Sequence, residues 1–141
     1  RLLVGETKES VLAPIQALLD KLMAEDPQLK AKVSYAVGKE QCYTGNEITG
    51  ERFFPGWLYD EKDEFVQDVK KELEGMGYTP EITQYNFCTN GSHYAGEAGI
   101  KTFGLGPSKE NLAHTVNEYI EIDQLTKVTD CYYGVMKALL K

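Results

Sequence analysis

Three stretches of this chain carry apolar side chains at the spacing of an α-helix, and this periodicity constrains the fold most strongly. The first predicted helix begins with Thr7 as its N-cap and ends before Pro27. The second follows Asp60 and ends at Gly75, and the third covers 122–140. The apolar positions are Val11, Ile15, Leu18, Leu19 and Leu22, then Phe65, Val66, Val69 and Leu73, then Leu125, Val128, Tyr132, Val135 and Leu139. Each helix therefore needs another surface to cover its apolar face.

Short runs of strand-forming residues lie between these helices. We predict strands at 1–4, 32–37, 82–87 and 100–105, and a short helical segment near 93–98. Strands that alternate with helices predict an α/β fold. In open sheets of this kind, ligands bind at the carboxyl ends of the strands.

A long polar stretch at 38–57 separates the two halves of the chain. Glycines, prolines and aromatic residues interrupt it, and it shows little periodicity. Connections of this length tend to be functional or to link domains. We place a boundary near Pro55, so that 1–55 belongs to one domain and 56–141 to another.

The composition narrows the possible partners. Hydrophobic residues make up 42% of the chain, which is enough for a packed core, and no apolar run is long enough to span a membrane. The formal net charge of -7 argues against nucleic acid and anionic membranes as main partners. The three cysteines are scattered, which favours a reducing cytoplasm. The chain enters an apolar run directly after Arg1, so we expect it to be the C-terminal part of a longer protein.

The two histidines are candidates for chemistry. His114 lies in a loop before the last helix, where a ring nitrogen could face a metal, and Asn117 or Glu118 could orient the ring. By spacing alone a surface or capping histidine is the more ordinary interpretation, because one imidazole is not a metal site. His93 follows the turn at 90–92, whose backbone N–H groups could bind a carboxylate, although an ordinary capped turn has the same pattern.

Arginine is rare in this chain. Of its fifteen basic residues only Arg1 and Arg52 are arginines, and a guanidinium is the preferred bidentate partner of a carboxylate. Both are therefore candidates to bind an acidic substrate, and for Arg52 a solvated loop residue is the alternative. No Gly-x-Ser-x-Gly elbow and no phosphate-binding loop occurs in the sequence.

Four runs, in a fixed order, resemble a known family signature. They are Thr89-Asn90-Gly91-Ser92, Ala98-Gly99-Ile100, Gly104-Leu105-Gly106-Pro107 and Ala113-His114-Thr115-Val116-Asn117-Glu118-Tyr119-Ile120. This set resembles the C-terminal signature of the metallopeptidases that include acetylornithine deacetylase, succinyl-diaminopimelate desuccinylase and aminoacylase. Many members carry Ala-His-Thr-Pro-Asn-Glu, so Val116 departs from the pattern. Residues 1–7 resemble the inner strand of the family's lid domain, and the region of Trp57 resembles the return to the catalytic domain.

The resemblance implies a fold for each part. Residues 1–55 would be the second half of an α+β lid (dimerisation) domain, and 56–141 the C-terminal part of an open-sheet α/β catalytic domain. It also implies a homodimer formed through the lid. Because the missing strands would leave sheet edges and apolar faces uncovered, we expect the chain to need its N-terminal part, or self-association, to fold.

The resemblance also implies a chemistry. His114 matches the family's last zinc ligand. Asn90, Gly91 and Ser92 match the loop that contacts the substrate carboxylate, and Arg1 matches a lid arginine that helps to bind it. The complete enzyme would hold two zinc ions, with cobalt or manganese as alternatives. A metal-activated water would cleave an amide bond of an N-acyl amino acid or small peptide that bears a carboxylate.

The remaining ligands and the general base of the family have no counterpart in this chain, so the chain alone is expected to be inactive. Two other functions stay open. One is a non-catalytic dimerisation or interaction module derived from that family. The other is a small-carboxylate binder that uses Gly91 and Arg52.

Overall fold

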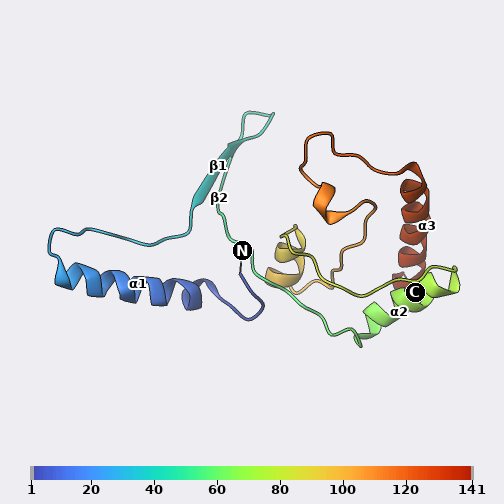
Figure 1. Ribbon diagram of the computed structural model, residues 1–141, viewed down its shortest axis with the longest axis horizontal. Helices are drawn as coiled ribbons and strands as arrows, with labels where there is room; N and C mark the ends of the chain where they lie inside the picture. The colour runs from blue at the N-terminus through green and yellow to red at the C-terminus, as the bar shows by residue number, and fades with distance from the viewer. Residues whose placement is uncertain (1, 141) are drawn as a thin grey trace. The chain divides into compact units, whose positions relative to one another are not determined.

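The computed structural model describes residues 2–140, which form two compact units (Figure 1). The first unit comprises residues up to Trp57 together with Ser92–Gly99, and the second comprises Leu58–Gly91 and the residues from Ile100 onward. The predicted boundary between lid and catalytic domain near Pro55 concerns the whole protein and stays a prediction. No helix in the described part is long and apolar enough to cross a membrane.

Helix α1, Lys8–Glu25, is the main element of the first unit and confirms the first predicted helix. Thr7 and Ser10 form a capping box, in which each side chain accepts a hydrogen bond from the other residue's backbone N–H. Pro14 lies inside the helix, which continues through it. The helix ends where the N–H of Asp26 donates to the carbonyl of Leu22, one residue before Pro27.

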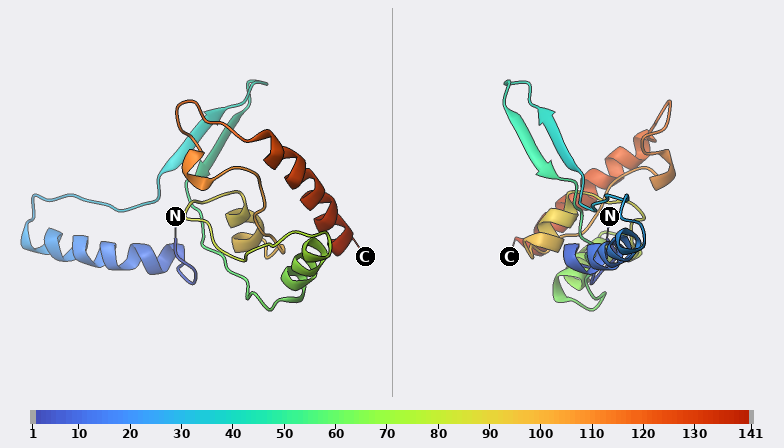
Figure 2. Two further views of the ribbon diagram at one scale, coloured as in Figure 1. Left: turned by 45° about the vertical axis from the view of Figure 1, so that its right-hand side comes forward. Right: turned by 90° about the vertical axis from the view of Figure 1, so that its left-hand side faces the viewer.

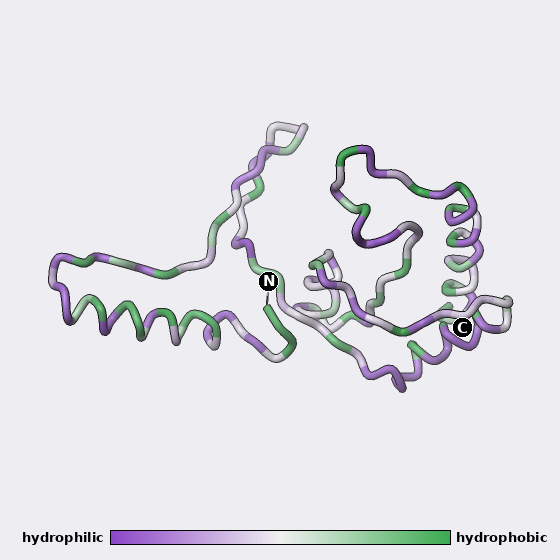
Figure 3. Tube along the Cα trace, in the orientation of Figure 1, coloured by the Kyte–Doolittle hydropathy of each residue, from purple (hydrophilic) through white to green (hydrophobic). Residues whose placement is uncertain are grey.

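The apolar side chains of α1 are at most half-buried. Hydrophobic residues recur along α1 (Figure 3), but the helix buries none of them fully, and Leu18 is 57% exposed. An amphipathic helix gains most of its stability from covering its apolar face. Among the described residues, no element provides that cover.

A β-hairpin follows, where we had predicted only a long connection. Strand β1, Val37–Gln41, pairs antiparallel with β2, Glu47–Glu51, and Gly45 has a φ of 86° in the turn between them (Figure 2). Nearly every residue of both strands is exposed, so no apolar side alternates with a polar one. For this reason the sequence lacks the alternation of apolar and polar residues that is typical of a half-buried strand. Backbone pairing and the cross-strand ion pair of Lys39 with Glu47 hold the hairpin.

The α/β class is confirmed, because helices and a small antiparallel sheet share the chain. The four predicted strands are wrong as strands in the described part: none of 2–4, 82–87 and 100–105 pairs with a neighbour, and of 32–37 only Val37 belongs to one. A strand exists only where another strand accepts and donates its backbone hydrogen bonds. These segments lack such partners among residues 2–140.

Two helices pack together in the second unit and confirm the other two predicted helices. They are α2, Glu64–Gly75, and α3, Ile122–Leu139. The core between them contains Val69, Leu73 and Ala138. Gly134 permits the close approach, since a Cβ there would lie 2.7 Å from the sulfur of Met76. The N-cap of α2 is Asp63, three residues after Asp60, and the helix begins at Glu64.

Candidate functional site

The loop that precedes α3 carries His114 in an unusual backbone conformation. Ser108, His114 and Asn117 have φ values of 77°, 61° and 60°, and they are the non-glycine residues with positive φ in the described chain. The left-handed conformation costs a residue with a Cβ roughly 1–2 kcal/mol, and such residues persist where the surrounding structure enforces them. Histidine and asparagine tolerate it better than most residues. The concentration of all three in one loop marks this loop as a candidate functional site.

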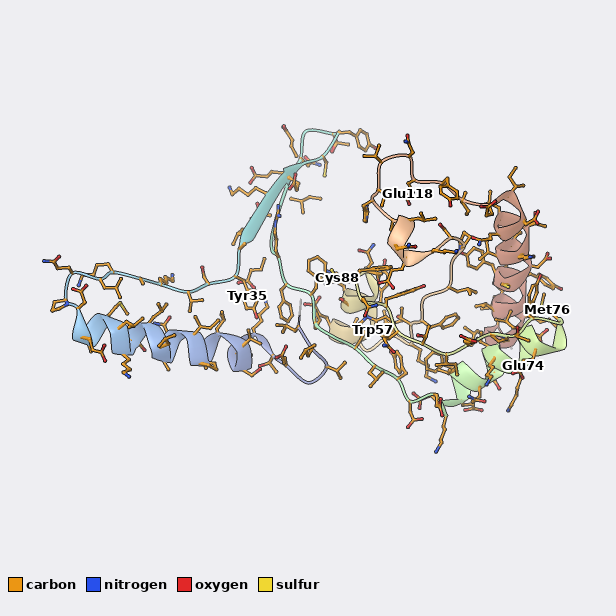
Figure 4. All side chains as sticks on the ribbon, in the orientation of Figure 1. Tyr35, Trp57, Glu74, Met76, Cys88 and Glu118 are labelled. Atoms are coloured by element: carbon orange, nitrogen blue, oxygen red, sulfur yellow. The ribbon has the colours of Figure 1, made fainter. Side chains whose placement is uncertain are left out.

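Hydrogen bonds within the motif enforce this conformation. The backbone N–H of His114 donates to Oε2 of Glu118 at 3.0 Å, and the N–H of Glu118 donates to the carbonyl of Thr115 at 3.2 Å. The hydroxyl of Thr115 donates to the carbonyl of Leu112 at 2.8 Å. Figure 4 shows Glu118 in this loop, between the short helix η2, Glu110–Leu112, and α3. The carboxylate of Glu118 thus orients His114 through its backbone, whereas the sequence suggested an effect on the ring.

A second set of hydrogen bonds closes the base of the loop. The N–H of Ser108 donates to Oε1 of Gln124 at 2.6 Å, and its hydroxyl donates to the carbonyl of Tyr119 at 3.3 Å. A small cavity of about 170 Å³ lies beside them, lined by Ser108, Lys109, Leu112, Tyr119, Ile120, Glu121 and Gln124. The loop is therefore fixed to the first turn of α3 at one end.

The ring of His114 is exposed and makes no hydrogen bond with another described residue. It can therefore supply one neutral nitrogen donor to a metal. Within residues 2–140, no group of three or more His, Cys, Asp or Glu side chains could hold a metal ion. The donor set of this chain fits a single ligand of a metal centre and does not fit a complete centre.

The predicted substrate loop leads into a π-helix. Residues Ser92–Glu97 form the π-helix η1, which agrees with the short helical segment predicted near 93–98. The Ser92 side chain is buried, at 3% exposure. The N–H of Gly91 donates to the hydroxyl of Thr89 at 3.0 Å, while Asn90 is exposed. A carboxylate bound here would have to compete with Thr89 for the Gly91 amide.

Arg52 forms an ion pair within its own hairpin. The guanidinium of Arg52 lies 3.5 Å from a carboxylate oxygen of Glu40 in the same hairpin, and both side chains are mostly exposed. Arg1 lies outside the described residues. Substrate binding by either arginine stays a prediction.

The structure shows one pair that the sequence analysis missed. Nδ1 of His93 lies 2.6 Å from Oε2 of Glu97, and the ring of Phe54 lies 5.3 Å from the imidazole, between centroids. The spacing of four residues between a histidine and a glutamate was the available signal, because it places both on one side of a helical turn. From the sequence we had singled out only the turn before His93.

Tyr85 is one of the residues of this unit whose pKa is raised. Burial raises the pKa of its phenol, and the neighbouring Tyr132 and Glu110 raise it further. Gly104 packs against its ring so closely that a Cβ would lie 2.1 Å from Cε2 of Tyr85. Glu110 also accepts a hydrogen bond from the N–H of Asn86 at 2.9 Å, which connects the segment at 85–86 to the histidine loop.

Comparisons with known proteins identify the family of this chain. Residues 5–138 match the model of peptidase family M20/M25/M40. The uncharacterized protein YgeY of Escherichia coli is 35% identical over 119 residues, which are 84% of this chain and 28% of that protein. N-formyl-4-amino-5-aminomethyl-2-methylpyrimidine deformylase of Halalkalibacterium halodurans is 32% identical over 128 residues, 88% of this chain and 28% of that protein.

A third relative, the uncharacterized protein YqjE of Bacillus subtilis, is 25% identical over 131 residues, 93% of this chain and 34% of that protein. No solved structure gives a match. The chain therefore spans between 28% and 34% of the length of these curated relatives.

Proposed function

The chain belongs to peptidase family M20/M25/M40, and on that premise we propose that it is part of a zinc-dependent amidohydrolase. The whole protein would cleave an amide bond of an N-acyl amino acid or a small peptide. Within the family we place it with the acetylornithine deacetylase, succinyl-diaminopimelate desuccinylase and aminoacylase group, on the ordered motifs at 89–120. The relative named as a deformylase supports a hydrolase of this kind.

One observation carries the proposal. His114 is exposed, is held in a left-handed conformation, and is fixed there by the carboxylate of Glu118. Residues held in sparsely populated backbone conformations cluster at active sites and ligand-binding loops. A side chain that must meet a ligand at a defined position needs such support from its neighbours.

His114 would hold a zinc ion through a ring nitrogen, with cobalt or manganese as alternative metals. When bound, the metal supplies a water molecule of lowered pKa, which is the nucleophile for amide cleavage. The remaining ligands and the general base would come from the part of the whole protein that precedes this chain. The contribution of this chain is then to orient one imidazole and to bind the substrate.

Substrate binding would use the loop at 90–92. Backbone N–H groups of Asn90, Gly91 and Ser92 would hold the substrate carboxylate, because aligned N–H groups attract an anion. Arg1 and Arg52 would supply additional positive charge to the same carboxylate. This role requires the guanidinium of Arg52 to leave Glu40. Because both side chains are mostly exposed, breaking this ion pair costs little free energy.

The first unit would serve assembly. We propose that the whole protein is a homodimer formed through the lid, to which 1–55 belongs, and that it acts in the cytoplasm. The exposed apolar side chains of α1, among them Leu18 and Leu22, support an interface in this part of the chain. The same observation favours the second candidate function, a non-catalytic dimerisation module derived from the family.

Replacement of His114 in the full-length protein separates the two functions. We expect His114→Ala to lose bound zinc and the hydrolysis of N-acyl amino acids together, measured by metal analysis and by release of the free amino group. Asn111→Ala, an exposed change in the same loop region, serves as the matched control and should retain both. An His114→Ala protein that keeps its zinc and its activity would contradict the proposal, and a wild-type protein without zinc or hydrolysis would favour the module.

A further inference from the structure

Gln124, in the first turn of α3, contacts the histidine loop, residues 108–119, in a way that the proposed function does not use. Its Oε1 accepts a hydrogen bond from the backbone N–H of Ser108 at 2.6 Å. A backbone N–H can only donate, so the amide oxygen of Gln124, and not its Nε2, faces Ser108. Nε2 makes no hydrogen bond with another described residue. The amide of Gln124 therefore holds the loop through its oxygen alone.

The position of Gln124 in α3 is typical of a different role. It is the third residue after the N-cap Glu121, and a glutamine there commonly bonds back to the N–H of the N-cap residue. Glu121 makes no side-chain capping hydrogen bond, and the backbone N–H of Gln124 donates to the carbonyl of Glu121 at 3.0 Å. The Gln124 side chain thus bonds to the histidine loop and not to its own helix.

The helix that carries Gln124 is firmly packed. Val128, one turn further along α3, is 8% exposed, and Ala138 packs against Leu73 of α2 in the core. Groups that stand on a packed helix are held more precisely than groups on a loop. Gln124 therefore offers the histidine loop a fixed point of attachment.

The contact closes the histidine loop at its base. Ser108 has a φ of 77°, which is unfavourable for a residue with a Cβ, and its hydroxyl donates to the carbonyl of Tyr119 at 3.3 Å. The two ends of the loop thus meet at Ser108, as in a compact Ω-loop. The residue before Tyr119 is Glu118, whose carboxylate accepts from the N–H of His114 at 3.0 Å. Three hydrogen bonds and one peptide bond therefore connect Gln124 to His114.

We propose that Gln124 is a positioning residue, which holds the histidine loop so that His114 meets the metal at a fixed place. This inference rests on the proposed function, in which His114 binds zinc. Gln124 acts on His114 through the loop and needs no contact with metal or substrate. Loss of its amide oxygen should leave the zinc site able to bind but weaken it by about 5-fold, which is the value of one hydrogen bond.

Two substitutions at this position separate the amide oxygen from the rest of the side chain. Gln124→Met is similar in length and helix propensity but lacks the oxygen. Gln124→Glu keeps an acceptor oxygen, and its negative charge is favourable in the first turn of a helix. Lys127→Ala, an exposed change in the next turn of α3, is the matched control.

Hydrogen–deuterium exchange on the metal-free full-length protein measures the loop itself. A peptide that covers 112–119, and so excludes Ser108, should exchange about 5-fold faster in Gln124→Met than in the wild type. Zinc affinity, measured against a competing chelator, should fall by a similar factor. Gln124→Glu and Lys127→Ala should match the wild type in both measurements. Rescue by glutamate distinguishes the oxygen from packing, because methionine fills a similar space without restoring either value.

The inference is overturned if either quantity keeps its wild-type value in Gln124→Met, or if Gln124→Glu loses as much as Gln124→Met. Zinc affinity of His114→Ala is measured beside these variants. A loss in His114→Ala with no loss in Gln124→Met contradicts only the role of Gln124. A wild type that binds no zinc contradicts the proposed function and this inference together.

Discussion

Removal of the Glu118 carboxylate should release the backbone of His114. The Glu118→Ala change leaves the N–H of His114 without its acceptor at 3.0 Å, while the left-handed φ of 61° remains unfavourable. The strain is roughly 1–2 kcal/mol, and a hydrogen bond of this kind offsets about 1 kcal/mol of it. We therefore expect the loop to open about 5-fold more often, since 1 kcal/mol corresponds to that factor.

Hydrogen–deuterium exchange on the full-length protein measures this opening. A peptide that covers 112–119 should exchange about 5-fold faster in Glu118→Ala, and zinc affinity should fall by roughly 10- to 100-fold, as for other residues that orient metal ligands. Glu121→Ala removes the same charge from the same loop without touching His114, and it is the matched control. Equal exchange in the two variants would refute the assignment of Glu118 as the residue that holds His114.

Two further predictions concern the second unit. Leu73→Ala should destabilise the full-length protein by about 2–5 kcal/mol, because the Leu73 side chain is 3% exposed and packs between α2 and α3. Leu58 is 73% exposed, so Leu58→Ala should change the free energy of unfolding little. Chemical denaturation measures both changes. Burial raises the pKa of Tyr85 above its ordinary value of 10.0, and Tyr132 and Glu110 raise it further. The contribution of Tyr85 to stability is therefore present below pH 10.0 and is lost as the pH rises through the folded-state pKa. Tyr85→Phe should remove this alkaline loss, which is seen as a smaller fall in the unfolding midpoint as the pH rises above 10.0. An identical fall in the wild type and the variant would contradict the role of Tyr85.

The helices could be predicted from the sequence because apolar positions repeat along them. Leu73 and Val69 lie one turn apart and are buried together against α3, as the periodicity requires. Thr7 was correctly identified as the N-cap of α1, because its hydroxyl accepts a hydrogen bond from the N–H of Ser10, only three residues further along the chain. Local signals of this kind do not depend on the rest of the protein.

The strands could not be placed in the same way. The segment at 82–87 has the composition of a strand, but pairing depends on a neighbour that these residues do not provide within the described chain. The hairpin of β1 and β2 does pair through its backbone, but both of its faces are exposed. Its sequence therefore lacks the alternation of apolar and polar residues by which a strand is recognised.

The candidate site was predicted in part. The motif around His114 was found by its resemblance to a family signature; membership of peptidase family M20/M25/M40 is confirmed, and the narrower group within it stays a prediction. Its left-handed backbone and the contact of Glu118 with the His114 amide are tertiary features that spacing does not encode. The pair of His93 and Glu97 was within reach of sequence analysis, because its spacing of four residues is that of one helical turn.

Zinc titration of the full-length protein tests the central claim most directly. Metal-free wild type and His114→Ala are titrated with zinc against a chelating indicator, and the number and affinity of the bound ions are compared. We predict tight zinc binding in the wild type and a loss of at least one tightly bound ion in His114→Ala. Equal stoichiometry and affinity in the two proteins would contradict the assignment of His114 as a metal ligand.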